Sequence, residues 1–135
     1  MARTHNKVRY SPKSKASAYT PVTAARGVEQ ALRVLEGRWK LLILFHLFDG
    51  KILRFSHLER AIPAISQKML IQQLRQMEND ELVRRIVHHQ VPPKVEYALT
   101  DWGQALCPAL DALLKGAALR EKIAENCREP SATPG

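Results

Sequence analysis

Residues 55–79 read FSHLERAIPAISQKMLIQQLRQMEN, and this stretch decides the fold. Pro63 cannot continue a helix, so it separates a short first helix from a second one. Ser66 is a good N-cap for the second helix, which we expect to run to about Asn79. The apolar side chains of this second helix recur at helical spacing, at Met69, Leu70, Leu74 and Met77. Two helices joined by the four residues 62–65 predict a helix-turn-helix.

The opposite face of the second helix carries side chains that suit DNA. Lys and Arg bind phosphate, Arg can donate two hydrogen bonds to guanine, and Gln suits adenine. The candidate DNA contacts on this helix are therefore Ser66, Gln67, Lys68, Ile71, Gln72 and Arg75. A plain solvated helix face is the alternative that this pattern alone leaves open.

A β-hairpin is expected directly after the second helix. Residues 83–89 are rich in strand formers, residues 90–93 form the loop, and apolar and polar side chains alternate over 94–99. Tyr97 alternates with Glu96 and is expected to point into the core. A helix-turn-helix followed by a hairpin predicts a winged helix, mainly α with a small β-hairpin (α+β). The candidate contacts to the DNA backbone are Arg84, Arg85 and Lys94 on the hairpin, with Arg54 and Lys40 as weaker candidates.

The flanking segments complete one domain of ordinary size. We expect an amphipathic helix over 28–35, a helix over 39–48 buried nearly all round, and a short strand over 52–55. Ser56 and Glu59 have the spacing of a capping box, and Thr100 with Asp101 can cap a long last helix. The expected boundaries are a basic flexible tail over 1–25, the winged-helix domain over 26–126, and a flexible C-terminal tail over 127–135.

The charge distribution favours a polyanionic partner. The net charge is +8; residues 1–26 carry six basic side chains and no acidic one, and residues 33–94 carry eleven basic against six acidic. No apolar run is long enough for a membrane span, and no apolar h-region follows the basic N-terminus, so we expect neither a transmembrane helix nor a secretory signal. Two cysteines are too few for a disulfide scaffold, so we expect a reducing, cytoplasmic setting.

At four places the chain resembles the HxlR family of bacterial regulators, over roughly residues 26–118. The segment over 37–44, GRWKLLIL, resembles the family's G-K-W-x-x-x-I-L signature, and RFSHL over 54–58 resembles its R-F-x-E-L. ISQKML over 65–70 resembles its I-S-x-K-M-L, and VPPKVEYALT over 91–100 its V-P-P-x-V-E-Y-x-L-T. The four motifs stand in the family's order.

This resemblance implies a homodimeric winged-helix transcription factor, related to MarR-type regulators, that binds a pseudo-palindromic operator in double-stranded DNA. Dimerisation would involve the terminal helices. The residues expected at that interface are Val28, Leu32, Leu106, Cys107, Leu110, Leu113 and Leu114. No cofactor or metal is implied, and a small-molecule effector is left open.

The chain departs from the family pattern in ways that bear on function. Many members carry a reactive cysteine in a C-P-V-E run, where this chain has Arg26-Gly27-Val28-Glu29. The family's Gly-Leu after the second helix is replaced by Glu81-Leu82, so we expect Asn79 or Asp80 to end that helix in the left-handed conformation. Cys107 is a candidate redox residue, although a buried small hydrophobe is the simpler interpretation.

Other classes of function are weighed against this interpretation. The sequence has no Gly-rich phosphate loop, no G-x-S-x-G and no H-E-x-x-H, so we do not expect an enzyme. The alternatives that stay open are a non-specific DNA-coating protein, a protein-interaction module with a winged-helix fold, and a thiol-based sensor that uses Cys107.

Overall fold

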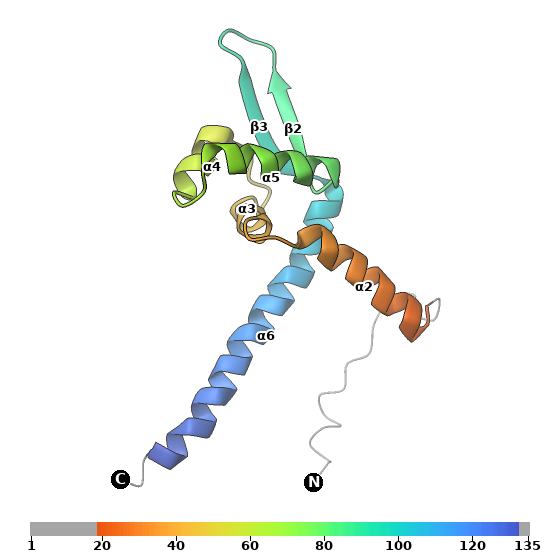
Figure 1. Cartoon of the computed structure of the whole chain (residues 1–135), viewed down its shortest axis with the longest axis vertical. Coiled ribbons are helices and arrows are strands. Elements are labelled where there is room, and N and C mark those ends of the chain that lie inside the picture. The colour runs from red at the N-terminus through yellow and green to blue at the C-terminus, as the bar shows by residue number, and fades with distance from the viewer. Residues whose placement is uncertain (1–18, 133–135) are drawn as a thin grey trace. The chain divides into compact units, whose positions relative to one another are not determined.

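The computed structural model describes residues 19–132, with side chains to residue 127 (Figure 1). The chain forms two compact units, Met1–Glu36 and Gly37–Gly135. Most of the expected basic tail, residues 1–18, lies outside the described residues, as do residues 133–135.

The first unit contains one described helix, α2 (Pro21–Leu35). Thr20 caps it: its side-chain oxygen accepts from the N–H of Thr23 at 3.2 Å, and the Thr23 hydroxyl accepts from the N–H of Thr20 at 2.9 Å. Pro21 fits the first helical position, because the N–H that it lacks would have no partner there. The expected tail over 1–25 is therefore wrong for residues 21–25, which are helical.

The second unit is a winged helix. Three helices, α3 (Lys40–His46), α4 (Phe55–Ala61) and α5 (Gln67–Asn79), precede the hairpin of β2 (Val83–His88) and β3 (Lys94–Leu99). A two-residue strand, β1 (Leu53–Arg54), adds to β3, so the antiparallel sheet has the order β1-β3-β2. The last helix, α6 (Asp101–Ala132), and the hairpin extend from opposite sides of the α3–α5 body (Figure 1). The predicted fold class is confirmed.

The helix-turn-helix is built as its sequence predicts. The Ser66 hydroxyl accepts from the N–H of Met69 at 3.1 Å and caps α5, which ends at Asn79. The apolar side of α5 is buried in the core, and β2 packs against this helix. The fully buried core residues are Ile43, Leu44, Leu47, Leu58, Leu70, Leu74, Met77, Leu82 and Val83.

Two local predictions before the turn are wrong. α4 begins at Phe55 rather than after Ser56, because His57 Nδ1 accepts from the N–H of Arg54 at 3.3 Å and so satisfies the helix start. α3 is not buried all round: one face enters the core, while Leu41, Leu42 and Phe45 are exposed. Within this seven-residue helix the buried residues are Lys40, Ile43 and Leu44, which recur at helical spacing on one side.

The end of α5 uses the position where the related family has glycine. Glu81 takes a φ of 62°, and the N–H of Leu82 donates to the carbonyl of Met77 at 2.9 Å. This 6→1 bond closes the helix end as in a Schellman motif. The prediction that Asn79 or Asp80 would adopt the left-handed conformation is therefore wrong.

α6 starts as predicted and ends later. The Thr100 hydroxyl accepts from the N–H of Gly103 at 3.0 Å, which confirms the cap. The helix continues to Ala132, so the expected tail over 127–135 is helical over 127–132. Residues 117–126 are mostly Ala, Leu, Glu, Lys and Arg, which are strong helix formers and carry the helix outward. Over 19–132, no helix is both long and apolar enough to cross a membrane.

Candidate nucleic-acid interface

The outer face of α5 presents a regular row of polar side chains. Lys68, Gln72, Arg75 and Asn79 stand at i, i+4, i+7 and i+11, opposite the buried row that includes Leu70 and Met77, and all four are exposed. The predicted contacts Ser66 and Gln67 are also exposed at the helix start, and Ile71 is 37% exposed. The structure thus places all six predicted contacts of this helix at its surface.

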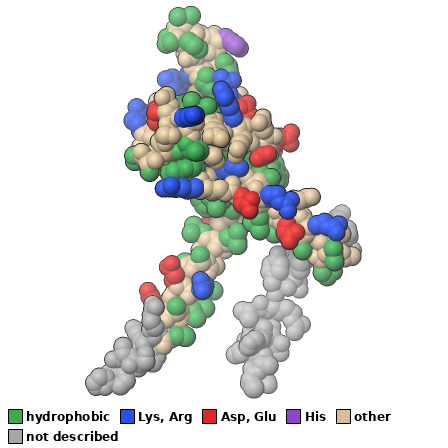
Figure 2. All heavy atoms as spheres, viewed as in Figure 1, with side chains coloured by type: hydrophobic (Ala, Val, Ile, Leu, Met, Phe, Trp, Pro, Cys, Tyr) green, Lys and Arg blue, Asp and Glu red, His purple; other side chains and the backbone are tan. Residues whose placement is uncertain are grey.

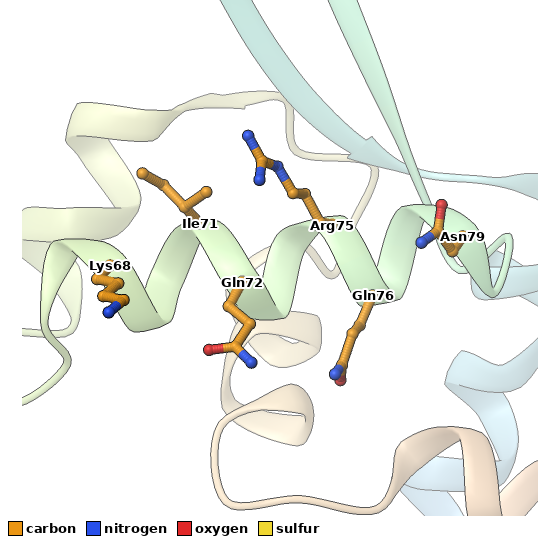
Figure 3. A pocket seen from close by; sticks show the side chains of 6 residues that line it. All are labelled: Lys68, Ile71, Gln72, Arg75, Gln76 and Asn79. Atoms are coloured by element: carbon orange, nitrogen blue, oxygen red, sulfur yellow. The ribbon is translucent and has the colours of Figure 1, made fainter.

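A shallow hollow of about 430 Å³ follows this face of α5 (Figure 3). In that view Ile71 and Arg75 point toward the strands, whereas Gln72 and Gln76 point to the other side. The residues that line this hollow are Lys68, Ile71, Gln72, Arg75, Gln76 and Asn79. Gln76 and Asn79 were not among the predicted contacts, although continuing the helical period from Lys68 reaches Asn79.

A second hollow, of about 400 Å³, connects α5 with the wing. Ile71, Arg75 and Glu78 of α5 line it together with Arg85 of β2 and Tyr97 of β3. Arg85 is the register partner of Tyr97 across the hairpin. The expectation that Tyr97 points into the core is wrong, because the ring is only half-buried and borders this hollow.

The two arginines at the start of β2 have different surroundings. Arg84 lines a further hollow, of about 540 Å³, which also contains the carboxylates of Glu78, Glu81 and Asp101. Arg85 borders both this hollow and the one beside Arg75. The structure therefore brings Arg85, but not Arg84, to the hollow that Arg75 lines.

The wing carries an ion-pair cluster near its tip. His88 Nε2 lies 2.7 Å from Glu96 Oε1, and Lys94 Nζ lies 3.6 Å from Glu96 Oε2. The hydrogen bond from His88, with a smaller contribution from the charge of Lys94, lowers the pKa of Glu96. The predicted backbone contact Lys94 is therefore held by a carboxylate of its own strand.

The two weaker candidates differ in accessibility. Arg54 is exposed beside the start of α4. Lys40 is only 9% exposed, and its aliphatic stem lies beside Gly37. Burial removes Lys40 as a phosphate contact, which corrects that prediction.

Apolar side chains are exposed along α6, whereas Lys and Arg gather over α5 and the base of the wing (Figure 2). Of the residues expected at a dimer interface, Leu113 and Leu114 are 61% and 56% exposed, and Val28 and Leu32 of α2 are also exposed. Leu106 and Cys107 are half-buried. Leu110 is wrong as an interface residue, because it is 7% exposed and belongs to the core. Sequence reasoning missed two exposed apolar residues further along α6, Leu119 and Ile123.

Cys107 borders a hollow of about 550 Å³ together with Phe48 and Asp49. Its Sγ donates to the carbonyl of Gly103 at 3.5 Å. Burial, and to a lesser degree the carboxylate of Asp49, raises the pKa of the thiol. A thiol in this setting stays protonated at neutral pH and is a poor nucleophile.

A capped helix with an exposed polar face, set beside a hairpin, defines a winged helix-turn-helix protein. The HxlR-like helix-turn-helix family model matches residues 34–123. The chain therefore belongs to the HxlR-like helix-turn-helix family of transcriptional regulators.

Relatives and solved structures agree with this family. The chain is 54% identical over 86 residues to the HTH-type transcriptional regulator YtcD of Bacillus subtilis. This alignment covers 64% of this chain and 68% of YtcD. It is 45% identical over 102 residues to an HTH-type transcriptional regulator of Methanothermobacter thermautotrophicus, covering 76% of this chain and 77% of that protein. The redox regulator HypR in its reduced form superposes with a TM-score of 0.66 at 41% identity, over 74% of this chain and 98% of HypR.

Proposed function

We propose that the protein is a sequence-specific regulator that places α5 in the major groove of double-stranded DNA. The observation that carries this proposal is the exposed row Lys68, Gln72, Arg75 and Asn79, which combines base-reading and phosphate-binding side chains on one helix face. The wing beside it supplies Arg85 for the DNA backbone. The major groove is wide enough to admit one helix.

In this proposal, the protein acts in the cytoplasm as a homodimer on a pseudo-palindromic operator. The exposed leucines Leu113 and Leu114 on α6 support a contact between two copies, since leaving both in water forfeits hydrophobic free energy. Val28 and Leu32 of α2 are further candidates for that contact. Two copies would then read half-sites about one helical turn apart, roughly 34–36 Å.

HypR is called a redox regulator, but for this chain we do not propose a thiol sensor. The raised pKa of Cys107 disfavours reaction at that thiol, and Arg26 stands where many family members have a reactive cysteine.

Selection of genomic DNA fragments by the purified full-length protein at physiological salt, followed by sequencing, tests the proposal. The expected result is a shared inverted repeat upstream of one or a few genes. Uniform recovery that disappears as salt rises would overturn it in favour of non-specific coating. A variant with Gln72→Ala should lose sequence preference, whereas Arg120→Ala on α6 should keep it.

A further inference from the structure

We propose that Arg75 and Arg85 form a clamp for one backbone phosphate of DNA, in the hollow between α5 and the wing. This inference rests on the proposed function and goes beyond it. It gives the two arginines one shared ligand, and it adds Tyr97 and Glu78 to the interface.

The first argument is the convergence of two cations that come from different elements. Arg75 lies in the middle of α5 and Arg85 lies in β2, yet both line the same hollow of about 400 Å³. Figure 3 shows the guanidinium of Arg75 on the side of the helix that faces the strands. Like charges repel, so this arrangement is most favourable when an anion lies between them.

The second argument is that both guanidinium groups are uncommitted. Over residues 19–127, no ion pair and no side-chain hydrogen bond includes Arg75 or Arg85. Lys94, in contrast, is paired with Glu96. A guanidinium offers five donors in a planar fork, which suits the oxygens of a phosphate.

The remaining walls of the hollow fit a phosphodiester on a duplex. Tyr97 is a neutral hydroxyl donor, and Ile71 gives an apolar wall. The hollow opens beside the row of α5 that we propose enters the major groove, so DNA held there runs a strand past it. Glu78 contributes one negative charge to the same hollow, which leaves a net charge of +1 and moderates the attraction.

The salt dependence of binding distinguishes one shared phosphate from two separate ones. Fluorescence anisotropy with a labelled 25-base-pair duplex of arbitrary sequence would be measured for the full chain over a range of chloride concentrations. The logarithm of the binding constant K falls linearly with the logarithm of the salt concentration, and each lost phosphate contact makes this slope shallower by about 0.9 per protomer. With one shared phosphate, Arg75→Ala, Arg85→Ala and the double variant all change the slope by about 0.9 or less, whereas separate phosphates give about 1.8 for the double variant.

Matched variants give the sign of each contribution. Arg120→Ala removes an equal charge from the exposed surface of α6, outside this hollow, and should leave the slope nearly unchanged. Tyr97→Phe should weaken binding by up to about tenfold without changing the slope, as for loss of a neutral donor to a charged group. Glu78→Gln should strengthen binding, a gain that a merely destabilising change would not produce.

Three outcomes would overturn the clamp. Additive slope changes for the two arginines would mean separate phosphates, and an unchanged slope together with an unchanged affinity for Arg85→Ala would mean that the wing residue makes no contact. If inorganic phosphate, replacing chloride at equal ionic strength, displaces DNA equally from the native protein and from Arg85→Ala, the hollow does not bind a phosphate. Failure of the native protein to bind any duplex would overturn the proposed function as well, and this result is distinct from all three.

Discussion

Gly103, in the first turn of α6, lies directly against the backbone carbonyl of Leu82, the residue before β2. The same carbonyl accepts from the N–H of Thr100 at 3.0 Å and from the Thr100 hydroxyl at 3.2 Å. One backbone oxygen therefore joins the start of the wing to the end of β3 and the start of α6. The position of α6 relative to α5 and the wing depends on this close approach.

Replacing Gly103 with Ala should destabilise the protein by about 2 kcal/mol, because the new Cβ meets backbone that cannot rotate away. Urea unfolding measures the loss. Gly116→Ala is the matched control in the same helix, where a Cβ meets nothing within 4 Å. That control should be neutral or stabilising by up to about 1 kcal/mol, and equal losses for both variants would contradict the packing argument.

Replacing Glu81 with Gly should stabilise the protein by about 1 kcal/mol, because a side chain is unfavourable at the φ of 62° that closes α5. The midpoint of thermal or urea unfolding measures this gain. Asp80→Gly, at a φ of −85°, should instead lose about 0.5–1 kcal/mol to the entropy of the unfolded chain. A loss of stability in both variants would show that the left-handed residue is not strained.

The contrast between Ser66 and Glu81 shows which parts of this fold can be predicted from sequence. Ser66 caps α5 through a hydrogen bond three residues away, so a local pattern is enough to find it. The helix end at Glu81 is set by tertiary packing, because the next two residues, Leu82 and Val83, are both buried where the chain enters β2. That tertiary demand overrides the preference of Asn and Asp for the left-handed conformation.

The candidate site shows the same division. Helical periodicity predicts the exposed row on α5, because Lys68, Gln72 and Arg75 follow from the spacing of the buried leucines. It cannot show that Arg85 shares a hollow with Arg75 whereas Arg84 does not, because this depends on how the hairpin packs on the helix. The burial of Lys40 could not be predicted from the sequence either, because it depends on the path of the backbone at Gly37, beside the lysine stem.

The pKa of Glu96 should lie below its ordinary value of 4.5, because the hydrogen bond with His88 favours the carboxylate. A folded pKa below the unfolded one gives stability that is present above pH 4.5 and is lost as the pH falls through the folded value. NMR titration of the Glu96 carboxyl measures the shift. In His88→Ala the pKa should move back toward 4.5, and in Lys94→Ala it should move less, because His88 is the larger cause.

The same cluster predicts how wing stability depends on pH. The free energies of unfolding of the native protein and of Glu96→Gln should differ at pH 7 and converge as the pH falls below the folded pKa of Glu96. A difference that stays constant from pH 7 to pH 3 would mean that the carboxylate contributes nothing through its charge.

The exposed leucines of α6 predict a dimer that charge can dissociate. Sedimentation velocity should give the native protein twice the 15.3 kDa mass of one chain. Leu113→Glu combined with Leu114→Glu should sediment as a single chain, because burying the two new carboxylates costs several kcal/mol. Lys122→Glu, on the charged face of the same helix, should stay dimeric. A folded double variant that keeps the dimer mass would place the interface elsewhere.

Cys107 should react slowly with iodoacetamide at pH 7, because its pKa is raised above the ordinary 9.0 by burial and by Asp49. Cys127 is exposed and should be alkylated first, as mass spectrometry of the partly modified protein can show.

Asp49→Asn removes the nearby charge and suits the φ of 66° at that position, so it should speed alkylation of Cys107 by about two- to threefold. Alkylation of Cys107 in the native protein should keep rising with pH beyond 9, since only the thiolate reacts. An inflection below pH 9, or a rate equal to that of Cys127 at pH 7, would restore Cys107 as a candidate sensor.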